Sequence, residues 1–599
     1  MFIRLKRLMV PALGVALALG LAACGPGPAA DTASASSTGS PRTVSLPEAE
    51  AWAQKTLETL SLERKIGQMI CAEMRGEFIA EDDPRYQNWI SLARDHGVGA
   101  FVLYGGTPQD TAALLNRLQK ASDLPLLISS DFEGGPGQQI VGATEFPGNM
   151  ALSAIGSEDL AYQLGKAGAA EGRAIGIHIT YSPVVDIQTR PDNPVLGVRS
   201  FGADLELLGR IAGAYIRGYQ ENGMLATAKH YPGRGEVELI AGTEYTINRK
   251  PADRVEAEDF LAFKKAIDAG VAYVMSEHIA VPSVAGGSDL PASVEKRLAT
   301  DWLRGRLGFK GILTTDDMWY EKVVQRFGAV EACVLAVEAG HDAVLKPADP
   351  VATIRGLVEA VKSGRISEDR INASVKKILT WKARLDLPRN RFVDESRVAS
   401  VVGRQSHRAL LQKIADESLT LVKNDGVFPT TADKLGSIVH ISIQRKEVDP
   451  VPAQVDAKLK AAFPKTKTFF LGPTTAKERY AEALKAAETA GTVVISLFHP
   501  RTAYKDNGPL KPADLEFLNR IIAAKPKAAI AMSYGNPYLA AGLKKAAAFA
   551  VGYGEGGFFG NQIVYADSFI RLLKGEIKPA GKLPVNVSAD FPMGTGVRY

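Results

Sequence analysis

Short apolar runs alternate with longer amphipathic segments from Leu46 to about Pro388. Apolar residues that recur every three to four positions are typical of helices, as in Asp110–Ala121, Asp159–Ile175 and Pro350–Ser363. Short continuous apolar runs are typical of strands buried on both faces. Eight such runs occur: Ile66–Met74, Val98–Tyr104, Leu124–Ser130, Ile177–Asp186, Leu225–His230, Val271–His278, Gly311–Asp317 and Asp342–Lys346. This alternation predicts an α/β fold with a (β/α)8, TIM-like barrel over residues 46–388.

Polar residues end most of these runs. They are Asp131, Asp186, Lys229-His230, Glu277-His278, Asp316-Asp317 and Lys346. In a barrel the carboxyl ends of all strands meet at one face, where sites are built. An open doubly wound sheet is the alternative fold, and it would not explain so many polar strand ends. The pattern predicts a site for a polar, hydroxyl-rich ligand, with solvated loop starts as the plainer interpretation.

The rest of the chain has the pattern of a second α/β domain. Residues 389–402 are polar and indicate a linker. A helix is predicted over His407–Val422, and buried strands over Ile438–Ser442, Val493–Leu497 and Ala528–Ser533. Residues 443–492 are weakly patterned, so the order of elements there stays open. We therefore expect a C-terminal α/β sandwich domain over residues 403–599.

The first 24 residues have the pattern of a targeting signal. Three basic residues precede an apolar run, Leu8–Ala22, which is shorter than the ~20 residues of a spanning helix. The end of the segment, Leu-Ala-Ala-Cys24, resembles the cleavage box of bacterial lipoproteins. That resemblance implies cleavage before Cys24 and a lipid on its sulfur. An ordinary signal peptide with an incidental cysteine is the alternative.

Residues 25–45 are nearly all Gly, Pro, Ala, Ser and Thr and predict a flexible tether. Together with the signal, the tether predicts an exported protein at the bacterial cell envelope, whose membrane partner is reached through the lipid anchor. Gly25 follows the cysteine, and the membrane face that holds the lipid stays open, as does the oligomeric state.

Charge and cysteine content exclude several classes of protein. The chain has 71 basic and 66 acidic residues, a net charge of +5, so no basic field indicates a nucleic-acid partner. Its three cysteines form neither a disulfide framework nor a zinc pattern. We expect no metal and no cofactor.

Several motifs resemble those of family 3 glycoside hydrolases. The segments are Asp131-Phe-Glu-Gly-Gly, Asn193-Pro-Val-Leu-Gly-Val-Arg199-Ser-Phe-Gly, Lys229-His230-Tyr-Pro-Gly-Arg-Gly235, Gly311-Ile-Leu-Thr-Thr-Asp316-Asp317-Met, Asp416-Glu-Ser-Leu-Thr-Leu-Val-Lys-Asn424 and Gly575-Glu-Ile-Lys-Pro-Ala-Gly-Lys-Leu-Pro584. They follow the family's order over nearly all of residues 46–599. The Lys-His-Tyr-Pro-Gly form most resembles the β-N-acetylglucosaminidase branch, which acts in peptidoglycan recycling.

The resemblance implies a retaining glycosidase that acts on a carbohydrate substrate. In such enzymes a carboxylate attacks the anomeric carbon and a second group protonates the leaving oxygen. Asp316, at a strand end, matches the family's nucleophile, and Asp317 should point away from it because side chains alternate along a strand. Asp131, Arg199, Lys229 and His230 match positions that bind sugar hydroxyls. Glu133 is expected to organise its loop.

Two positions depart from the family pattern. In the β-N-acetylglucosaminidase branch an Asp-Ser-His follows the Lys-His loop, and its histidine is the general acid/base. Here those positions are Ile240-Ala241-Gly242. The Asp-x-Glu-Gly-Gly motif is often followed by arginine in the family, whereas this chain has Pro136.

Three explanations of the missing histidine stay open. A carboxylate of the same loop replaces it, with Glu244 ranked above Glu236 and Glu238 because it lies two residues beyond the lost position. Alternatively the acid comes from the second domain, as in the family's β-glucosidase branch. The candidates there are His499, Asp506 and Glu555. The third explanation is loss of catalysis with retention of sugar binding.

These considerations predict an exported, lipid-anchored, β-N-acetylhexosaminidase-like retaining hydrolase with Asp316 as nucleophile and Glu244 as acid/base. Its expected substrates are peptidoglycan fragments or related β-linked sugars. The alternatives are a catalytically impaired carbohydrate-binding lipoprotein, and a β-glucosidase or β-xylosidase that uses an acid from the second domain.

Overall fold

Eight parallel strands form the first sheet, and its two ends meet. The computed structural model describes residues 43–599 except 194, 239–245, 445–449, 499–509 and 555–561. The strands are β1 (Ile70–Arg75), β2 (Ala100–Tyr104), β3 (Leu127–Ser130), β4 (Ile179–Thr180), β5 (Leu225–Tyr231), β8 (Tyr273–Ser276), β10 (Ile312–Thr315) and β11 (Val344–Leu345). Their order is β10-β8-β5-β4-β3-β2-β1-β11, and a parallel bridge from Thr314 to Ala343 joins the outer two. This is the predicted TIM-like barrel.

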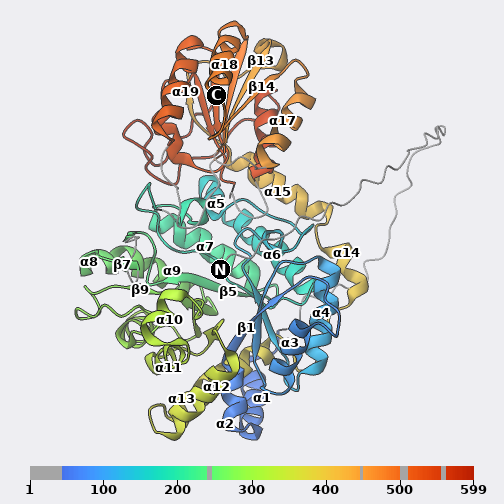
Figure 1. The fold of residues 1–599 in the computed structure, drawn as a ribbon, viewed down its shortest axis with the longest axis vertical. Coiled ribbons are helices and arrows are strands. Elements are labelled where there is room, and N and C mark those ends of the chain that lie inside the picture. The colour runs from blue at the N-terminus through green and yellow to red at the C-terminus, as the bar shows by residue number, and fades with distance from the viewer. Residues whose placement is uncertain (1–42, 194, 239–245, 445–449, 499–509, 555–561) are drawn as a thin grey trace, which may run out of the picture. The chain divides into compact units, whose positions relative to one another are not determined.

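Helices surround the barrel strands (Figure 1). They are α1 (Leu46–Thr59), α2 (Leu62–Gln68), α3 (Pro84–Arg94), α4 (Pro108–Ala121), α5 (Asn149–Ile155), α6 (Glu158–Ala174), α7 (Leu205–Gln220), α8 (Ala252–Arg254), α9 (Leu261–Asp268), α10 (Glu321–Phe327), α11 (Ala329–Ala339), α12 (Pro350–Lys362) and α13 (Glu368–Arg384). Local sequence sets their starts. Asp349, for example, accepts a hydrogen bond from the backbone of Ala352, and Pro350 has no N–H to satisfy.

A small sheet lies beside the barrel, in the order β6 (Val237–Glu238), β7 (Thr246–Asn248) and β9 (Ile279–Ala280). It flanks residues 239–245, which lie outside the described part of the chain. The predicted acid Glu244 falls in that gap, as Cys24 falls in residues 1–42. Both assignments stay predictions.

The second sheet has six strands in the order β12-β17-β16-β15-β13-β14. They are β12 (Thr420–Asn424), β13 (Ile438–Ile443), β14 (Lys467–Leu471), β15 (Thr492–Leu497), β16 (Ala529–Ser533) and β17 (Ala548–Val551), and only β12 runs antiparallel to its neighbour. The helices of this region are α15 (Gln405–Ser418), α16 (Ala432–Leu435), α17 (Pro450–Ala462), α18 (Lys477–Thr489), α19 (Pro512–Ala524) and α20 (Gln562–Leu573). α17 packs against α20, and α18 against α19. This sheet with its helices is the predicted C-terminal α/β sandwich.

One sequence-based prediction for this region is wrong, and one stretch whose elements were left open is now described. The helix predicted over His407–Val422 ends at Ser418, because Thr420–Asn424 pairs with β17 as strand β12. β-branched Thr420 and Val422 favour a strand, and the partner strand lies over 120 residues away, so periodicity alone missed it. The weakly patterned region 443–492 contains α17, β14 and α18.

Residues 389–402, expected to be a linker, contain a short turn of helix, Glu395–Arg397, and α14 (Val398–Val401). This stretch packs on the barrel, where the backbone N–H of Val393 donates to the side chain of Asn116 at 2.9 Å. Among the described residues, no helix combines the length and apolarity needed to cross a membrane.

Candidate active site

The carboxyl ends of the barrel strands carry a continuous set of charged side chains. Asp131 follows β3, and Lys229 and His230 lie near the end of β5. Glu277 follows β8 and Asp316 follows β10. The parallel register brings β8 and β10 side by side, with Thr315 opposite Ser276. Closure of the barrel therefore gathers residues that lie as far apart in sequence as Asp131 and Asp316 at one face.

Glu133 holds together two of the predicted sugar-binding residues. Its carboxylate accepts from Arg199 Nε and Nη2, both at 2.5 Å, and lies 2.8 Å from Lys229 Nζ. Lys229 also donates to Asp131 Oδ1 at 2.7 Å. Burial opposes the charge of Lys229, but Asp131 and Glu133 raise its pKa above the ordinary value. Asp131 remains partly exposed, so its carboxylate faces the open side of the site.

His230 is oriented by a buried carboxylate. Its Nδ1 lies 2.7 Å from Asp186 Oδ2, and its backbone N–H donates to the same oxygen at 3.1 Å. Asp186 also accepts from the backbone of Arg234 at 2.7 Å. Burial raises the pKa of Asp186 to about 6 in spite of these donors and the Arg234 charge. The arrangement leaves His230 Nε2 directed toward Arg199 Nη2, 3.5 Å away.

Asp316 lies in a second cluster, with Glu277 and Arg234. Arg234 Nη2 is 3.5 Å from Asp316 Oδ2 and also forms an ion pair with Glu277. The backbone N–H of Asp317 donates to Asp316 Oδ1 at 2.7 Å. One side-chain polar atom from each of His230, Glu277 and Asp316 lies within 4.8 Å of the other two. The clusters built on Glu133 and on Asp316 therefore meet at His230.

Residues 61–381 match the model of the glycosyl hydrolase family 3 N terminal domain, which is more than half of the chain. The chain belongs to glycosyl hydrolase family 3. The beta-N-acetylglucosaminidase/beta-glucosidase of Cellulomonas fimi is 31% identical over 403 residues, 66% of this chain and 70% of that protein. The resemblance stated from the motifs is confirmed, and the chain is a glycoside hydrolase.

Solved structures of the family support the same conclusion. A family 3 beta-N-acetylglucosaminidase from Paenibacillus sp. str. FPU-7 is 29% identical, with a TM-score of 0.76 over 88% of this chain and 99% of that one. The beta-glucoside phosphorylase BglX is 25% identical, with a TM-score of 0.77 over 90% and 97% of the two chains. Both likenesses extend through the barrel and the second sheet.

The two carboxyl groups of the Asp316 cluster differ in their ionisation. Burial opposes ionisation of Asp316, but a hydrogen bond from Glu277 and the charge of Arg234 lower its pKa below the ordinary value. Burial and the nearby negative charge of Asp316 raise the pKa of Glu277 well above the ordinary value, and Arg234 only partly offsets them. The pKa values of the two neighbouring carboxyl groups therefore shift in opposite directions, that of Asp316 downward and that of Glu277 upward.

Asp317 contacts a different set of groups from Asp316. Its Oδ2 lies 3.0 Å from Lys346 Nζ, and Lys346 also lies 3.1 Å from Glu73. Burial and the charge of Asp316 raise the pKa of Asp317 to about 7, in spite of Lys346. Asp316 and Asp317 therefore direct their carboxylates to separate partners, as alternation along a strand predicts.

His278 packs beneath this part of the site. Its Nε2 lies 3.0 Å from the Asp317 carbonyl and its Nδ1 2.9 Å from Ser293 Oγ. Burial lowers its pKa, so its ring is neutral at pH 7 and donates one N–H. Its ring stacks on Tyr320, with centroids 5.5 Å apart. His178 also lies buried and accepts from the backbone N–H of Ile128, as a core histidine does.

Two residues of the site carried little signal in the sequence. Arg234 lies inside the Lys-His-Tyr-Pro-Gly-Arg-Gly motif, which predicts no role for it, and Glu277 is marked in the sequence only by its place at a strand end. An isolated arginine in a Gly-x-Gly turn has no spacing that marks it as an active-site residue. Glu236, an alternative acid, accepts a hydrogen bond from Arg254 of α8 at 2.7 Å. Its carboxylate is therefore engaged in an ion pair.

The residues that could hold a cation are His230, Glu277 and Asp316. The guanidinium of Arg234 already contacts both carboxyl groups. A side chain therefore supplies the counter-charge here, and we assign no metal to this cluster.

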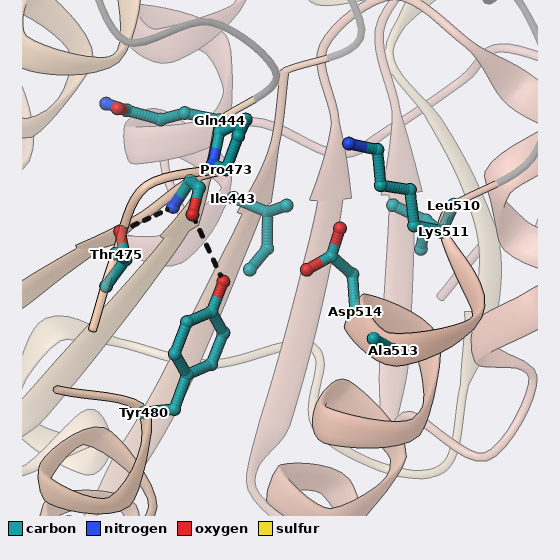
Figure 2. Close-up of a pocket in the computed structure, with 10 residues that line it drawn as sticks. Ile443, Gln444, Pro473, Thr475, Tyr480, Leu510, Lys511, Ala513 and Asp514 are labelled. Carbon is teal, nitrogen blue, oxygen red and sulfur yellow. Dashed lines mark hydrogen bonds between the residues drawn. The ribbon is translucent and has the colours of Figure 1, made fainter. Parts of the chain in front are cut away.

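The second sheet has a cavity of its own, shown in Figure 2. It measures about 230 Å³ and lies at the carboxyl ends of β13 and β14. Thr475 Oγ1 accepts from the backbone of Gly472, whose carbonyl accepts from Tyr480, while Lys511 and Asp514 lie across the cavity. Asp514 is the one carboxylate among the described residues that line it. The candidates His499, Asp506 and Glu555 lie outside the described ranges.

Proposed function

We propose that this chain is a retaining β-N-acetylhexosaminidase with Asp316 as its nucleophile. The observation that carries the proposal is an ionised Asp316 at a strand end, beside the Asp131–Lys229–Glu133 cluster that can bind sugar hydroxyls. A carboxylate held charged in a buried site is a competent nucleophile for an anomeric carbon. The names of relatives such as the Cellulomonas fimi and Paenibacillus enzymes support an acetamido sugar as substrate.

In this proposal the glycon sits over Asp316. Asp131 accepts hydrogen bonds from vicinal hydroxyls, and Lys229 and Arg199 donate to hydroxyl or acetamido oxygens. Glu133 orients both cations, and Asp186 orients His230. Asp316 attacks C1 as the glycosidic bond breaks and becomes esterified to the sugar. Water then attacks C1, releases Asp316 and gives a product of retained configuration.

We further propose that the substrates are peptidoglycan fragments or related β-linked sugars, and that the protein is exported and held at the envelope by a lipid on Cys24. The signal-like pattern of residues 1–24 and the branch of the family support this setting.

The test uses nitrophenyl and dinitrophenyl β-N-acetylglucosaminides with wild-type and Asp316→Ala protein. Wild type should hydrolyse the dinitrophenyl compound, which leaves without protonation. The variant should lose at least ~10³-fold in kcat/KM. Azide should rescue it partially and yield the α-glycosyl azide, since azide then displaces the aglycone directly. A folded wild-type protein that turns over neither substrate would contradict the proposal.

A second candidate is activity on β-glucosides. It is favoured by the double name of the Cellulomonas fimi relative and by the structural likeness to a beta-glucoside phosphorylase. The same assay with nitrophenyl β-glucoside, run with and without inorganic phosphate, separates the reactions. Sugar 1-phosphate formed only with phosphate would indicate phosphorolysis. Binding of N-acetylglucosamine without turnover of any substrate would instead support a carbohydrate-binding lipoprotein.

A further inference from the structure

Arg234 brings a guanidinium to Asp316 from the loop that follows β5. Its Nη2 lies 3.5 Å from Asp316 Oδ2 and also forms an ion pair with Glu277, which follows the neighbouring strand β8. The side chains of Arg234 and Glu277 are at most 10% exposed. The other oxygen of the aspartate, Oδ1, accepts from the backbone N–H of Asp317 at 2.7 Å. Both oxygens of the Asp316 carboxylate therefore face a donor, and Arg234 supplies a positive charge.

The backbone of Arg234 is fixed on both sides. Its N–H donates to Asp186 Oδ1 at 2.7 Å, and its carbonyl accepts from Asn193 Nδ2 at 2.7 Å. The same amide also donates to the Gly235 carbonyl at 3.0 Å. Gly235 has no space for a side chain, because a Cβ there would lie 2.4 Å from the Ile187 carbonyl oxygen. A side chain that begins from a fixed backbone loses less conformational freedom when it binds a partner.

A cation beside a nucleophilic carboxylate acts unequally on the two steps of retaining hydrolysis. In the first step Asp316 bonds to C1 and loses its negative charge, so its attraction to Arg234 weakens. In the second step water adds to C1, the bond from C1 to Asp316 breaks, and the electron pair of that bond returns to the carboxylate. The water proton passes to the acid/base, for which Glu244, outside the described residues, stays the prediction. Arg234 stabilises the charge that develops on the departing carboxylate.

We propose that Arg234 is a positioning residue that orients Asp316 for attack and speeds its release from the glycosyl enzyme. The inference rests on the proposed function, because it assigns a role only if Asp316 forms an ester with the sugar. Glu277 holds the guanidinium while Asp316 is esterified. Since Glu277 contacts Arg234 and Asp316, it lies on the nucleophile's side of C1, opposite to the leaving oxygen.

The experiment compares wild type, Arg234→Gln and Arg234→Lys on the dinitrophenyl β-N-acetylglucosaminide. Because this aglycone leaves without protonation, we expect release of the sugar from Asp316 to limit turnover. Arg234→Gln should lower kcat by roughly 10²-fold. KM should fall as well, because the glycosyl enzyme accumulates, and kcat/KM should fall less than kcat. A burst of dinitrophenol and a protein mass increased by one sugar residue measure that accumulation.

Two other arginines give contrasting controls. Arg199 belongs to the sugar-binding cluster through its hydrogen bond to Glu133, so Arg199→Lys should raise KM without accumulation of the glycosyl enzyme. Arg210 of α7 pairs with Glu158 of α6 at 3.2 Å, with side chains 56% and 45% exposed. Arg210→Gln should stay near wild type in kcat and KM. The fall of kcat and KM together is therefore expected only at Arg234.

The pH dependence of kcat/KM separates an electrostatic role from a purely structural one. Burial opposes ionisation of Asp316, and a hydrogen bond from Glu277 and the charge of Arg234 lower its pKa. Other titratable groups near Asp316 are His230, His278, Asp317 and Tyr104. Loss of the Arg234 charge should raise the pKa of Asp316, so the fall of kcat/KM toward low pH should begin at a higher pH in Arg234→Gln. Arg234→Lys keeps the charge and should keep the wild-type profile.

A folded Arg234→Gln protein with neither accumulation of the glycosyl enzyme nor a shifted pH profile would overturn the proposal. Where Arg234→Gln does not fold, Arg234→Lys decides. Lysine lacks the planar fork that fixes the carboxylate, so this variant should still lower kcat roughly tenfold, with KM. A kcat equal to that of wild type would then overturn the proposal.

Failure of the proposed function has a different signature. If wild type itself forms no glycosyl enzyme from the dinitrophenyl substrate, both assignments are wrong. If wild type reacts through the glycosyl enzyme and the Arg234 variants behave like it, Asp316 stands as nucleophile and Arg234 does not position it.

Discussion

At the scale of single residues, Glu133 is a buried carboxylate that pairs with two buried cations. Its carboxylate pairs with Arg199 through two hydrogen bonds and with Lys229 at 2.8 Å. All three side chains are less than 8% exposed. Removing one partner of a buried ion pair lowers the free energy of unfolding more than removing one partner of a surface pair does. The remaining buried charge then has neither a partner nor solvent.

We predict that Glu133→Gln lowers the free energy of unfolding by about 3–5 kcal/mol, since it leaves two buried cations short of a counter-charge. Urea unfolding of the purified variant measures this. Asp95→Asn is the control, because Asp95 and Arg94 form an ion pair at 2.7 Å with side chains 45% and 59% exposed. It should leave the free energy of unfolding nearly unchanged, because solvent screens an exposed pair. Equal effects of the two substitutions would contradict the role given to Glu133.

Asp317 should make stability depend on pH near neutrality. Its pKa is about 7 in the folded protein and about 3.9 in an unfolded chain, so the folded state holds the proton more tightly. This contribution is complete at low pH and is lost as pH rises through 7. We therefore predict that wild type loses more stability than Asp317→Asn between pH 5 and pH 8. Parallel losses, measured by urea unfolding at both pH values, would show that Asp317 does not titrate in this range.

At the scale of elements, glycines let α6 and α7 of the barrel shell approach each other closely. Gly165 of α6 and Gly218 of α7 face the opposite helix, and a Cβ on Gly218 would lie 2.3 Å from the Tyr162 carbonyl oxygen. That oxygen belongs to backbone and cannot move aside without shifting α6. The two glycines thus set the distance at which α7 leads into β5 and its Lys229-His230 pair.

We predict that Gly218→Ala destabilises the protein by about 1–3 kcal/mol through overpacking of the two helices. Gly213→Ala on the same helix is the matched control. Its Cβ would meet Ala269 Cβ at 3.4 Å, an ordinary contact, so the better helix propensity of alanine should dominate. We expect that variant to gain up to about 1 kcal/mol. Thermal unfolding of both variants gives the comparison, and a neutral Gly218→Ala would mean that α6 shifts freely.

At the scale of the whole molecule, the barrel and the second sheet share buried contacts. His407 of α15 lies 2.6 Å from Glu171 of α6, and the backbone N–H of Gly148 donates to the Tyr553 carbonyl at 3.0 Å. Residues from Pro41 to Tyr599 form one compact unit. A chain cut after the barrel would expose these groups, so the assays above need the full body of the protein.

The N-terminal segment gives a prediction at the same scale. In a bacterial host that processes lipoproteins, the wild-type chain should incorporate labelled palmitate and fractionate with membranes. Cys24→Ser should abolish the label and release the protein, with no change in kcat/KM on the dinitrophenyl substrate. Labelling that persists in the variant would place the modification elsewhere.

Local pattern predicted the eight barrel strands, three of their flanking helices by range and the polar residues at the strand ends, because buried strands and amphipathic helices each have a repeat that can be recognised without knowing the partner. The family followed from motifs in the same order. The β12 strand was predicted as helix, and β14 lay in a region whose elements were left open, since pairing with other strands stabilises both of them more than local propensity does.

Only the tertiary structure decided which charges meet. Arg234, Glu277 and Asp316 are separated by up to 82 positions, and neither the arginine nor the glutamate has a spacing that marks it. Their contact depends on barrel closure, which sets β8 beside β10 and turns the loop after β5 across both. The ionisation of the two carboxyl groups depends in turn on burial and on each other's charge. Sequence determined which acidic and basic groups are present, and the fold decided in which direction the pKa of each carboxyl group shifts, because the shift depends on distance and solvent exclusion.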